Sequence, residues 1–394
     1  MDGRGTSGRV RPGVNHWWID SDGELSRLVD ALADESEIAL DTEFHRERSY
    51  HPHLALLQVG WGEDSVALVD ALAVDLYALR PVITGPATIV MHAAAQDLEV
   101  LIRACGALPE HLYDTQIAAG FAGYSNPSLV TLVEGVLSFR LPKGDRLADW
   151  LRRPLSSDQR DYAAADVAHL LELRHWLVDR LGRDGRETWA EDECVELLRR
   201  AAVPRDPEEA WWKIKEARQL RGRAIGVAQV VAAWRERRAS ELDQPVRFVL
   251  PDLALVGIAQ RPPADVGALR RVRGLDDRHL RGSVPDELLA AVAEGLELPR
   301  HRVRVPTSGD IDRDLRPAVA LISAWVGQLG RRLHIDSTLL ATRADVEALL
   351  RGDERARLAH GWRAEVLGQD IRRLVEGRAA IAFDGRGGLV LEDR

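Results

Sequence analysis

The strongest constraint on the fold is a change of pattern halfway along the chain, where strand-like segments stop and only helical ones follow. Over residues 25–200, short apolar runs of strand length alternate with helical patterns. This alternation is typical of an α/β domain with a mixed sheet. Residues 211–297 and 312–385 carry helical patterns without such runs. We therefore expect an α/β domain followed by two small all-α domains.

Two stretches rich in proline, glycine and charge, residues 201–210 and 298–313, separate these segments and predict linkers. The N-terminal stretch is polar and glycine-rich and lacks the apolar segment of a signal peptide, which favours a flexible lead-in. The expected boundaries are a lead-in at 1–24, an α/β domain at 25–200, and helical domains at 211–297 and 312–385.

Hydrophobic periodicity places the individual elements of the α/β domain. The first three expected strands follow one another closely, which indicates an antiparallel meander. The expected strands are 37–44, 54–61, 65–70, 87–93 and 111–115. The expected helices are 95–104, 115–123, 128–137 and 158–181.

The two helical segments resemble each other. Residues 234–259 align without gaps on residues 325–350 at an offset of 91, with Trp234 opposite Trp325 and Leu242 opposite Leu333. Most of the matched positions are apolar, as expected for two copies of one small domain that keep the same core. Chance similarity between two amphipathic helix pairs is the alternative interpretation.

Charge is unevenly distributed along the chain. Residues 1–204 hold 20 Lys and Arg against 33 Asp and Glu, whereas 205–300 hold 17 against 15. An acidic first half favours a cation site. The arginines of the C-terminal half suit bidentate phosphate contacts, although a GC-rich genome would also produce an arginine excess.

The remaining composition describes a soluble globular protein without a membrane segment. Hydrophobic residues make up 45% of the chain and charged residues 29%, and no apolar run reaches the ~18 residues of a membrane span. The two cysteines, Cys105 and Cys194, cannot form a disulfide framework for this length. A reducing, cytoplasmic location is therefore expected.

Two carboxylates end the first expected strand. In the stretch EIALDTEFHRE (37–47), Asp41 and Glu43 follow an apolar lead and occupy alternate positions. Their side chains therefore leave the same face of the strand. Two partly buried carboxylates repel each other unless a cation lies between them. The alternative is an exposed strand end whose acids are solvated.

Two further sites carry polar residues where chemistry is possible. Asp97 lies in the first turn of a helix that follows the strand ending near His92, where the helix dipole alone favours an acid. Tyr162 and Asp166 are four residues apart and share one face of a helix. Each feature alone is explained by ordinary capping or hydrogen bonding.

Taken together, these motifs resemble the DEDD exonucleases, in the subgroup with tyrosine in the third motif. The order is D-x-E on a strand, then Asp97 after His92, then Y-x3-D on a late helix. Within that group the chain is similar to the ribonuclease D family. The similarity extends to HLALLQVG (53–60), DTQIAAGF (114–121) and ADWLRRPLSSDQ (148–159). Residues 211–239 resemble the start of an HRDC domain, a small helical nucleic-acid-binding module, and the internal repeat resembles a second, diverged copy.

The resemblance implies a ribonuclease H-like mixed sheet that assembles four carboxylates around two divalent ions, Mg²⁺ or Mn²⁺. Asp41, Glu43 and Asp166 would hold one ion, and Asp41 would bridge to the second, supported by Asp97. One ion would activate water, and the other would stabilise the leaving 3′ oxygen. Tyr162 would orient the attacking water.

Contacts to substrate are expected from two regions. Phe44, next to the metal-binding strand, could stack on terminal bases or serve as a core aromatic. The segment 141–154 supplies Lys143, Arg146, Arg152 and Arg153 just before the catalytic helix. These side chains could hold phosphates or belong to a solvated loop.

The resemblance implies a 3′–5′ exoribonuclease that trims single-stranded 3′ ends of structured RNA, such as tRNA precursors, and releases nucleoside 5′-monophosphates. The residues alone imply only metal-dependent phosphodiester hydrolysis. A 3′–5′ DNA exonuclease and a non-catalytic nucleic-acid-binding scaffold remain as alternatives. We expect RNA as the partner, no membrane association and no protein partner.

Overall fold

The computed structural model describes residues 15–142, 148–304 and 313–394. The chain divides into two compact units. The first unit comprises Met1–Phe44, Leu54–Ala202 and Asp310–Arg394; the second comprises His45–His53 and Val203–Gly309. Within the described ranges, no helix is both long enough and apolar enough to cross a membrane.

A six-stranded mixed sheet forms the centre of the first unit, in the order β1-β4-β3-β2-β5-β6. The β3–β4 pair is antiparallel, whereas β1 pairs with β4, β2 with β5 and β5 with β6 in parallel. This arrangement confirms the expected mixed sheet. The strands are β1 (Trp17–Ile19), β2 (Glu37–His45), β3 (His53–Trp61), β4 (Ser65–Asp70), β5 (Thr88–Met91) and β6 (His111–Asp114).

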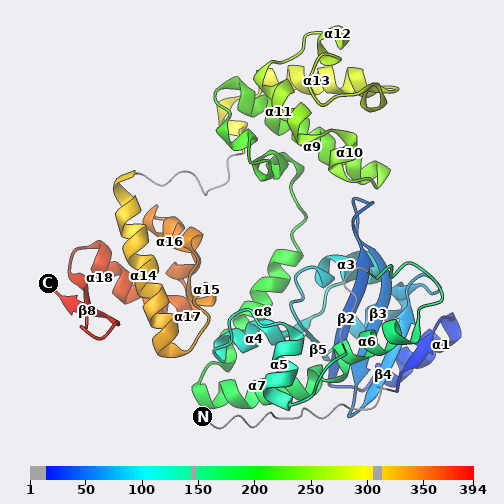
Figure 1. Ribbon diagram of the computed structural model, residues 1–394, viewed down its shortest axis with the longest axis vertical. Coiled ribbons are helices and arrows are strands. Elements are labelled where there is room, and N and C mark those ends of the chain that lie inside the picture. Colours follow the sequence, from blue (N-terminus) through cyan, green and yellow to red (C-terminus); the bar gives the residue numbers. More distant parts are fainter. Residues whose placement is uncertain (1–14, 143–147, 305–312) are drawn as a thin grey trace, which may run out of the picture. The chain divides into compact units, whose positions relative to one another are not determined.

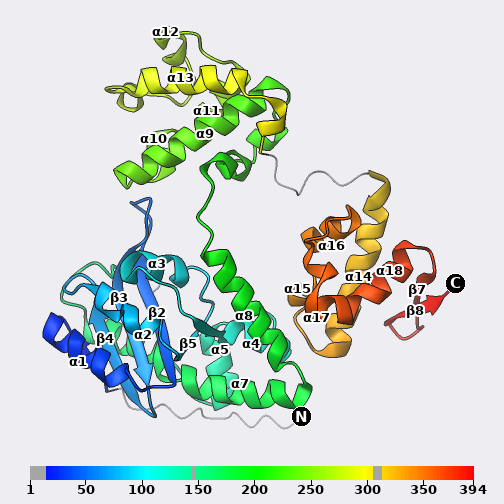
Figure 2. The same cartoon turned by 180° about the vertical axis from the view of Figure 1, so that it is seen from behind.

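Helices cover both faces of this sheet. Figure 1 shows α6 crossing one face, and the opposite view in Figure 2 shows α1 and α2 on the other. Separate apolar clusters fill the space on the two faces. The helices are α1 (Asp22–Leu32), η1 (Leu76–Leu79), α2 (Arg80–Ile83), α3 (Asp97–Cys105), α4 (Thr115–Phe121), α5 (Leu129–Leu132), η2 (Val133–Leu137), α6 (Ser157–Ala168), α7 (Leu170–Asp184) and α8 (Glu187–Ala201).

Two expectations for this domain were wrong in detail. The lead-in was expected to reach residue 24, but Trp17–Ile19 form β1 and α1 begins at Asp22. A three-residue strand is too short to show a period in the sequence. The single helix expected at 158–181 is broken at His169, which is buried, has φ −117° and stacks on Phe139 with 5.1 Å between ring centroids.

The second unit contains a helical domain built around the long helix α9. Its main apolar cluster joins α9 to α11, α13 and the segment around Trp211, which is 1% exposed. The elements are η3 (Pro207–Lys213), η4 (Ala217–Gln219), α9 (Arg223–Leu242), α10 (Val246–Val249), α11 (Asp252–Gln260), α12 (Val266–Leu269), η5 (Asp277–Leu280), α13 (Val284–Glu297) and η6 (Arg300–Arg302).

Residues 45–53 belong to the same unit and are held against α9 by polar contacts. The Tyr50 hydroxyl donates to Glu236 at 2.9 Å. Asp243, just beyond the end of α9, accepts from the His51 backbone at 3.0 Å and contacts the His53 ring at 2.8 Å. These bonds explain why a segment that joins two strands groups with a helical domain.

The C-terminal helical segment belongs to the first unit. It ends in a two-stranded sheet that the sequence analysis did not predict, with a turn containing Gly385 and Gly387, both at positive φ. The elements are η7 (Arg313–Leu315), α14 (Arg316–Leu333), α15 (Ser337–Leu340), α16 (Arg343–Leu350), η8 (Arg357–Ala359), α17 (Gly361–Arg363), η9 (Ala364–Gly368), α18 (Gln369–Val375), β7 (Ala379–Phe383) and β8 (Leu389–Asp393).

The 91-residue repeat reappears as matching helix boundaries. Helices α9 and α14 end at Leu242 and Leu333, and each is followed by a left-handed residue. The next two helices, α10 and α11, begin 91 residues before α15 and α16. The matched tryptophans also behave alike, because each ring N–H donates to a carboxylate, Trp234 to Glu287 and Trp325 to Asp370.

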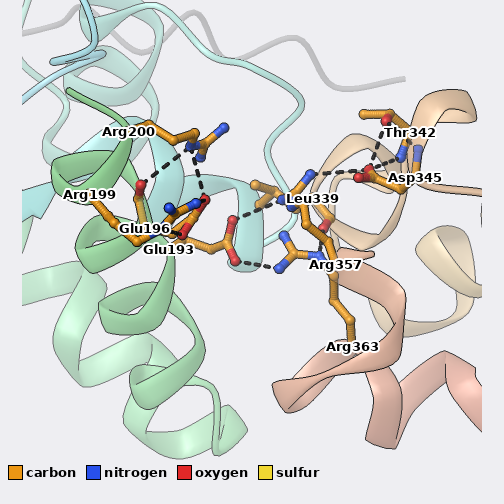
Figure 3. A network of polar contacts seen from close by, with 9 residues as sticks. All are labelled: Glu193, Glu196, Arg199, Arg200, Leu339, Thr342, Asp345, Arg357 and Arg363. Atoms are coloured by element: carbon orange, nitrogen blue, oxygen red, sulfur yellow. Dashed lines mark hydrogen bonds and ion pairs between the residues drawn. The ribbon is translucent and has the colours of Figure 1, made fainter. Parts of the chain in front are cut away.

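The C-terminal segment packs on α8 and α4 of the nuclease part through aromatic rings and ion pairs. Trp362 stacks on Trp189 with centroids 5.0 Å apart. Beside it, buried Glu193 of α8 accepts from Arg357 at 3.0 Å and from Arg363 (Figure 3). Removing one partner from a buried pair is strongly destabilising, so this segment is part of the folded nuclease unit and not an appended tail.

Candidate active site

The strand β2 places the first two carboxylates. Its residues Ile38, Ala39 and Leu40 are at most 4% exposed and anchor the strand in the core. Asp41 and Glu43 follow on alternate positions of the same strand, so their side chains leave one face. Thr42, between them, points to the other face and donates a hydrogen bond to Asp97.

A buried acid that sequence reasoning did not single out builds the turn before Asp97. Asp114, at the end of β6, accepts hydrogen bonds from the backbone N–H groups of Ala93 and Ala94 at 3.1 and 2.8 Å. It also caps α4 through the Gln116 N–H at 2.8 Å. Ala93 has φ 60°, which an alanine adopts only when surrounding bonds enforce it. Asp114 therefore fixes the tight turn that starts α3 at Asp97.

Helix α6 supplies the remaining two residues. Its N-terminus carries a capping box in which Ser156 and Gln159 satisfy each other's backbone N–H groups. One face is lined by small buried residues, including Ala163 and Ala164, so the helix lies close to the sheet. The Tyr162 hydroxyl hydrogen-bonds the Asp166 carboxylate one turn later.

The fold brings the predicted carboxylates together. Oxygen atoms of Asp41, Glu43 and Asp166 all lie within 4.8 Å of one another. Asp97 lies outside this group, but its charge raises the pKa of both Asp41 and Glu43. Distant segments of the sequence thus share one acidic cluster, with the fourth acid beside it.

Burial makes this cluster unfavourable without a cation. It raises the pKa of Glu43 to about 8, of Asp166 to about 7 and of Asp97 to about 6. The pKa of Asp41 is also raised well above its usual range, first by burial and then by the charges of Asp166, Asp97 and Glu43. The donor set is all oxygen, which suits Mg²⁺ or Mn²⁺. A divalent cation would compensate both the burial and the repulsion.

These pKa shifts predict that the metal-free protein becomes less stable as the pH rises. The folded pKa values lie above those of the unfolded chain, about 4, so stability is lost as pH rises from about 4 to about 8. In EDTA, Asp166→Asn should melt higher than wild type, with a difference that grows from pH 5 to pH 8.5. Calorimetric melting at several pH values tests this, and a pH-independent difference would contradict it.

Of the residues predicted to contact substrate, the structure describes Phe44, Arg152 and Arg153. Phe44 is partly buried and, by strand alternation, points to the face opposite Asp41 and Glu43. Arg152 is exposed. Lys143 and Arg146 lie outside the described residues.

Arg153, which the sequence placed in the same basic loop, instead has a structural role. It forms a two-pronged ion pair with buried Asp70 of β4, at 2.7 and 2.6 Å, and donates to the Ala55 carbonyl. This pair fixes the segment that leads into α6. A Pro at 154 and an acid at the end of β4 are weak signals that did not identify the pair in advance.

Two family models match the chain. The model of a 3′–5′ exonuclease domain matches residues 17–182, and the model of the HRDC domain matches residues 225–293. All five candidate catalytic residues lie inside the first match. The second match covers one of the two helical segments.

Curated relatives and solved structures match over nearly the whole chain. Ribonuclease D of Acidiphilium cryptum is 36% identical, covering 93% of this chain and 95% of its own length. Ribonuclease D of Cronobacter turicensis is 34% identical, covering 91% and 99%. The crystal structure of Escherichia coli RNase D, described as an exoribonuclease involved in structured RNA processing, matches with a TM-score of 0.82 and 33% identity, covering 92% of this chain and 99% of that one.

Proposed function

The chain belongs to the ribonuclease D family and is a 3′–5′ exoribonuclease; from that premise we propose that Asp41, Glu43, Asp97 and Asp166 hold two divalent cations during hydrolysis. The observation that supports this most directly is the convergence of three carboxylates within 4.8 Å. Mg²⁺ and Mn²⁺ are the ions that suit such ligands. When bound, a pair of such ions supplies an activated water and charge stabilisation for the leaving oxygen.

The residues of this chain then have separate roles. Asp41, which lies among the other acids, would bridge the two ions, while Glu43 and Asp166 would complete one site and Asp97 would support the other. The Tyr162 hydroxyl donates a hydrogen bond to Asp166, and burial raises the pKa of Tyr162 above its usual value of 10. It therefore stays protonated and orients the attacking water without acting as a base.

The proposed substrate is the single-stranded 3′ end of a structured RNA, such as a tRNA precursor, with nucleoside 5′-monophosphates as products. The E. coli relative is described as acting in structured RNA processing, which supports this class. Arg152, together with Lys143 and Arg146, remains a proposed contact to the terminal nucleotides, whereas Phe44, which strand alternation turns away from Asp41 and Glu43, fits the alternative of a core aromatic.

The test of this substrate class uses RNA hairpins with 3′ tails of increasing length. We expect stepwise removal of the tail, a stop near the stem and release of 5′-monophosphates. Digestion of a fully paired blunt hairpin at the same rate would contradict the proposal. Calorimetric titration of Mn²⁺ into the metal-free protein should give two sites per chain.

The first helical domain is proposed to bind RNA through a groove that is separate from the acidic cluster. A cavity of about 560 Å³ lies between η3, α9, α13 and η6. Among described residues, Arg237 and Arg302 on its rim make no ion pair, and both side chains are exposed. Val230, Ala233 and Leu298 contribute apolar atoms to a mainly polar lining that also holds Glu208 and Glu294. Exposed guanidinium groups without an ion-pair partner suit the phosphates of single-stranded RNA.

Removing the two groove arginines should reduce the salt dependence of RNA binding. The double variant Arg237→Ala/Arg302→Ala should bind a 5′-fluorescein RNA more weakly and lower the slope of log K against log salt by about 1.4, since each phosphate contact contributes about 0.7. Anisotropy titrations in EDTA, which prevents cleavage, measure this. The control is Arg270→Ala/Arg273→Ala, two exposed arginines of the same domain. Equal slopes for both variants and wild type would remove the groove from the proposal.

A cytoplasmic location is also proposed. Cys105 and Cys194 are buried free thiols, and burial raises the pKa of each to about 12. The Cys194 sulfur accepts from the Asp114 backbone N–H at 3.3 Å, so it packs behind the turn that carries Asp97. Thiols used in packing suit a reducing compartment.

A further inference from the structure

Gln58 is a buried amide without a hydrogen-bond partner, in the middle of β3. It is 0% exposed, and neither its side-chain nitrogen nor its side-chain oxygen bonds any residue that the structure describes. Leaving such a group unpaired carries the full cost of removing it from water. An apolar residue would avoid this cost, as Leu57 and Val59 do on either side.

The register of the sheet places Gln58 beside Asp41. A Cβ added to Gly60 would lie 3.3 Å from the Cβ of Ala39, so these two residues are neighbours on adjacent strands and on one face. The connection between β2 and β3 is short, residues 46–52, which requires an antiparallel pair. Gln58 comes two residues before Gly60, and Asp41 comes two residues after Ala39. In an antiparallel pair these two residues are therefore also opposite each other on the same face, with Cβ atoms about 4.5–5.5 Å apart.

Helix α6 covers the same face. The added Cβ at Gly60 would also lie 3.2 Å from the Val167 carbonyl oxygen, and Val167 is the residue after Asp166. Gln58 is thus enclosed between the strand that carries Asp41 and the helix that carries Asp166 and Tyr162.

We propose that Gln58 is a positioning residue whose side-chain N–H, unpaired in the metal-free protein, donates to the Asp41 carboxylate once the cations are bound and fixes the orientation of that carboxylate toward them. This inference rests on the proposed two-metal function. A bridging carboxylate must present both oxygens in defined directions, and a neutral donor orients it without competing for the ions. Partners of metal ligands typically contribute about 10- to 100-fold to metal affinity or activity.

The test replaces the amide by a group of the same length that cannot donate, Gln58→Met. The metal-free variant should melt a few degrees higher than wild type, because an unpaired amide is removed. Calorimetry should show Mn²⁺ affinity lowered about 10- to 100-fold, and kcat should fall while KM for RNA stays unchanged. Gln58→Leu serves as a second apolar variant.

The matched control is Gln229→Met. Gln229 is also buried, but its amide donates to the Arg302 carbonyl at 3.2 Å and accepts from the Arg304 N–H at 2.6 Å in the first helical domain. This variant should lose stability and keep Mn²⁺ affinity.

Unchanged Mn²⁺ affinity in both Gln58 variants would overturn the proposal and leave Gln58 a packing residue. Loss of stability or failure to fold in both would also overturn it, since the amide would then be bonded elsewhere. If wild type itself bound no Mn²⁺, the proposed function would fail first, and the two failures are therefore distinguishable.

Discussion

Asp41→Asn is expected to lower RNA turnover by roughly 10³-fold or more, because the proposed pair of ions would stabilise the reaction by several kcal/mol and each 1.36 kcal/mol is tenfold in rate. Glu43→Gln, Asp97→Asn and Asp166→Asn should have effects of similar size. Each variant removes one negative charge from the acidic cluster. Oxygen atoms of Asp41, Glu43 and Asp166 lie within 4.8 Å of one another, and Asp97 lies beside them. Single-turnover rates at saturating Mn²⁺ measure the loss.

These variants should remain folded, since each relieves repulsion between buried acids. The control is Asp179→Asn, an exposed acid on α7 without a described ion pair, which should keep wild-type turnover. A carboxylate variant that retained near wild-type turnover would not be an essential ligand, and its assignment here would be wrong.

Tyr162→Phe is expected to lower the rate ~10- to 1000-fold while leaving Mn²⁺ affinity unchanged, because it removes an orienting hydroxyl and no metal ligand. Phenylalanine keeps the ring that packs near Trp150, whose centroid is 6.1 Å away. The fold should therefore be retained. Calorimetry and single-turnover rates on the same preparation separate the two effects.

Loss of Mn²⁺ binding in Tyr162→Phe would contradict the role given to the hydroxyl. Tyr77→Phe is the control, since Tyr77 is 55% exposed on η1 and outside the acidic cluster. It should leave both rate and metal affinity unchanged.

The residues of the acidic cluster could be singled out from the sequence because they lie on elements with strong local patterns. The apolar lead of β2 placed Asp41 and Glu43 on one face, and the four-residue spacing of Tyr162 and Asp166 placed them on one side of a helix. That these distant segments meet followed from the family resemblance, because strand and helix periodicity alone does not determine which elements converge.

Tertiary contacts explain what the sequence did not show. Asp114 and Arg153 act through partners far away in sequence, at the Ala94 N–H and at Asp70, so no local pattern reveals them. The C-terminal segment was expected as a small helical domain, with no indication of what it packs against. Trp362 and Arg363 pack against Trp189 and Glu193, contacts that depend on how two segments dock and that no local pattern reveals.

The most direct test of the central claim incubates the purified protein with 5′-labelled RNA and a DNA of matched sequence, in Mn²⁺, Mg²⁺ or EDTA. We predict a ladder of progressively shorter labelled RNA products with Mn²⁺ or Mg²⁺, little shortening of the DNA and none of the RNA in EDTA. A ladder in EDTA, or immediate release of labelled mononucleotide from the 5′ end, would contradict a metal-dependent 3′–5′ exoribonuclease built on Asp41, Glu43, Asp97 and Asp166.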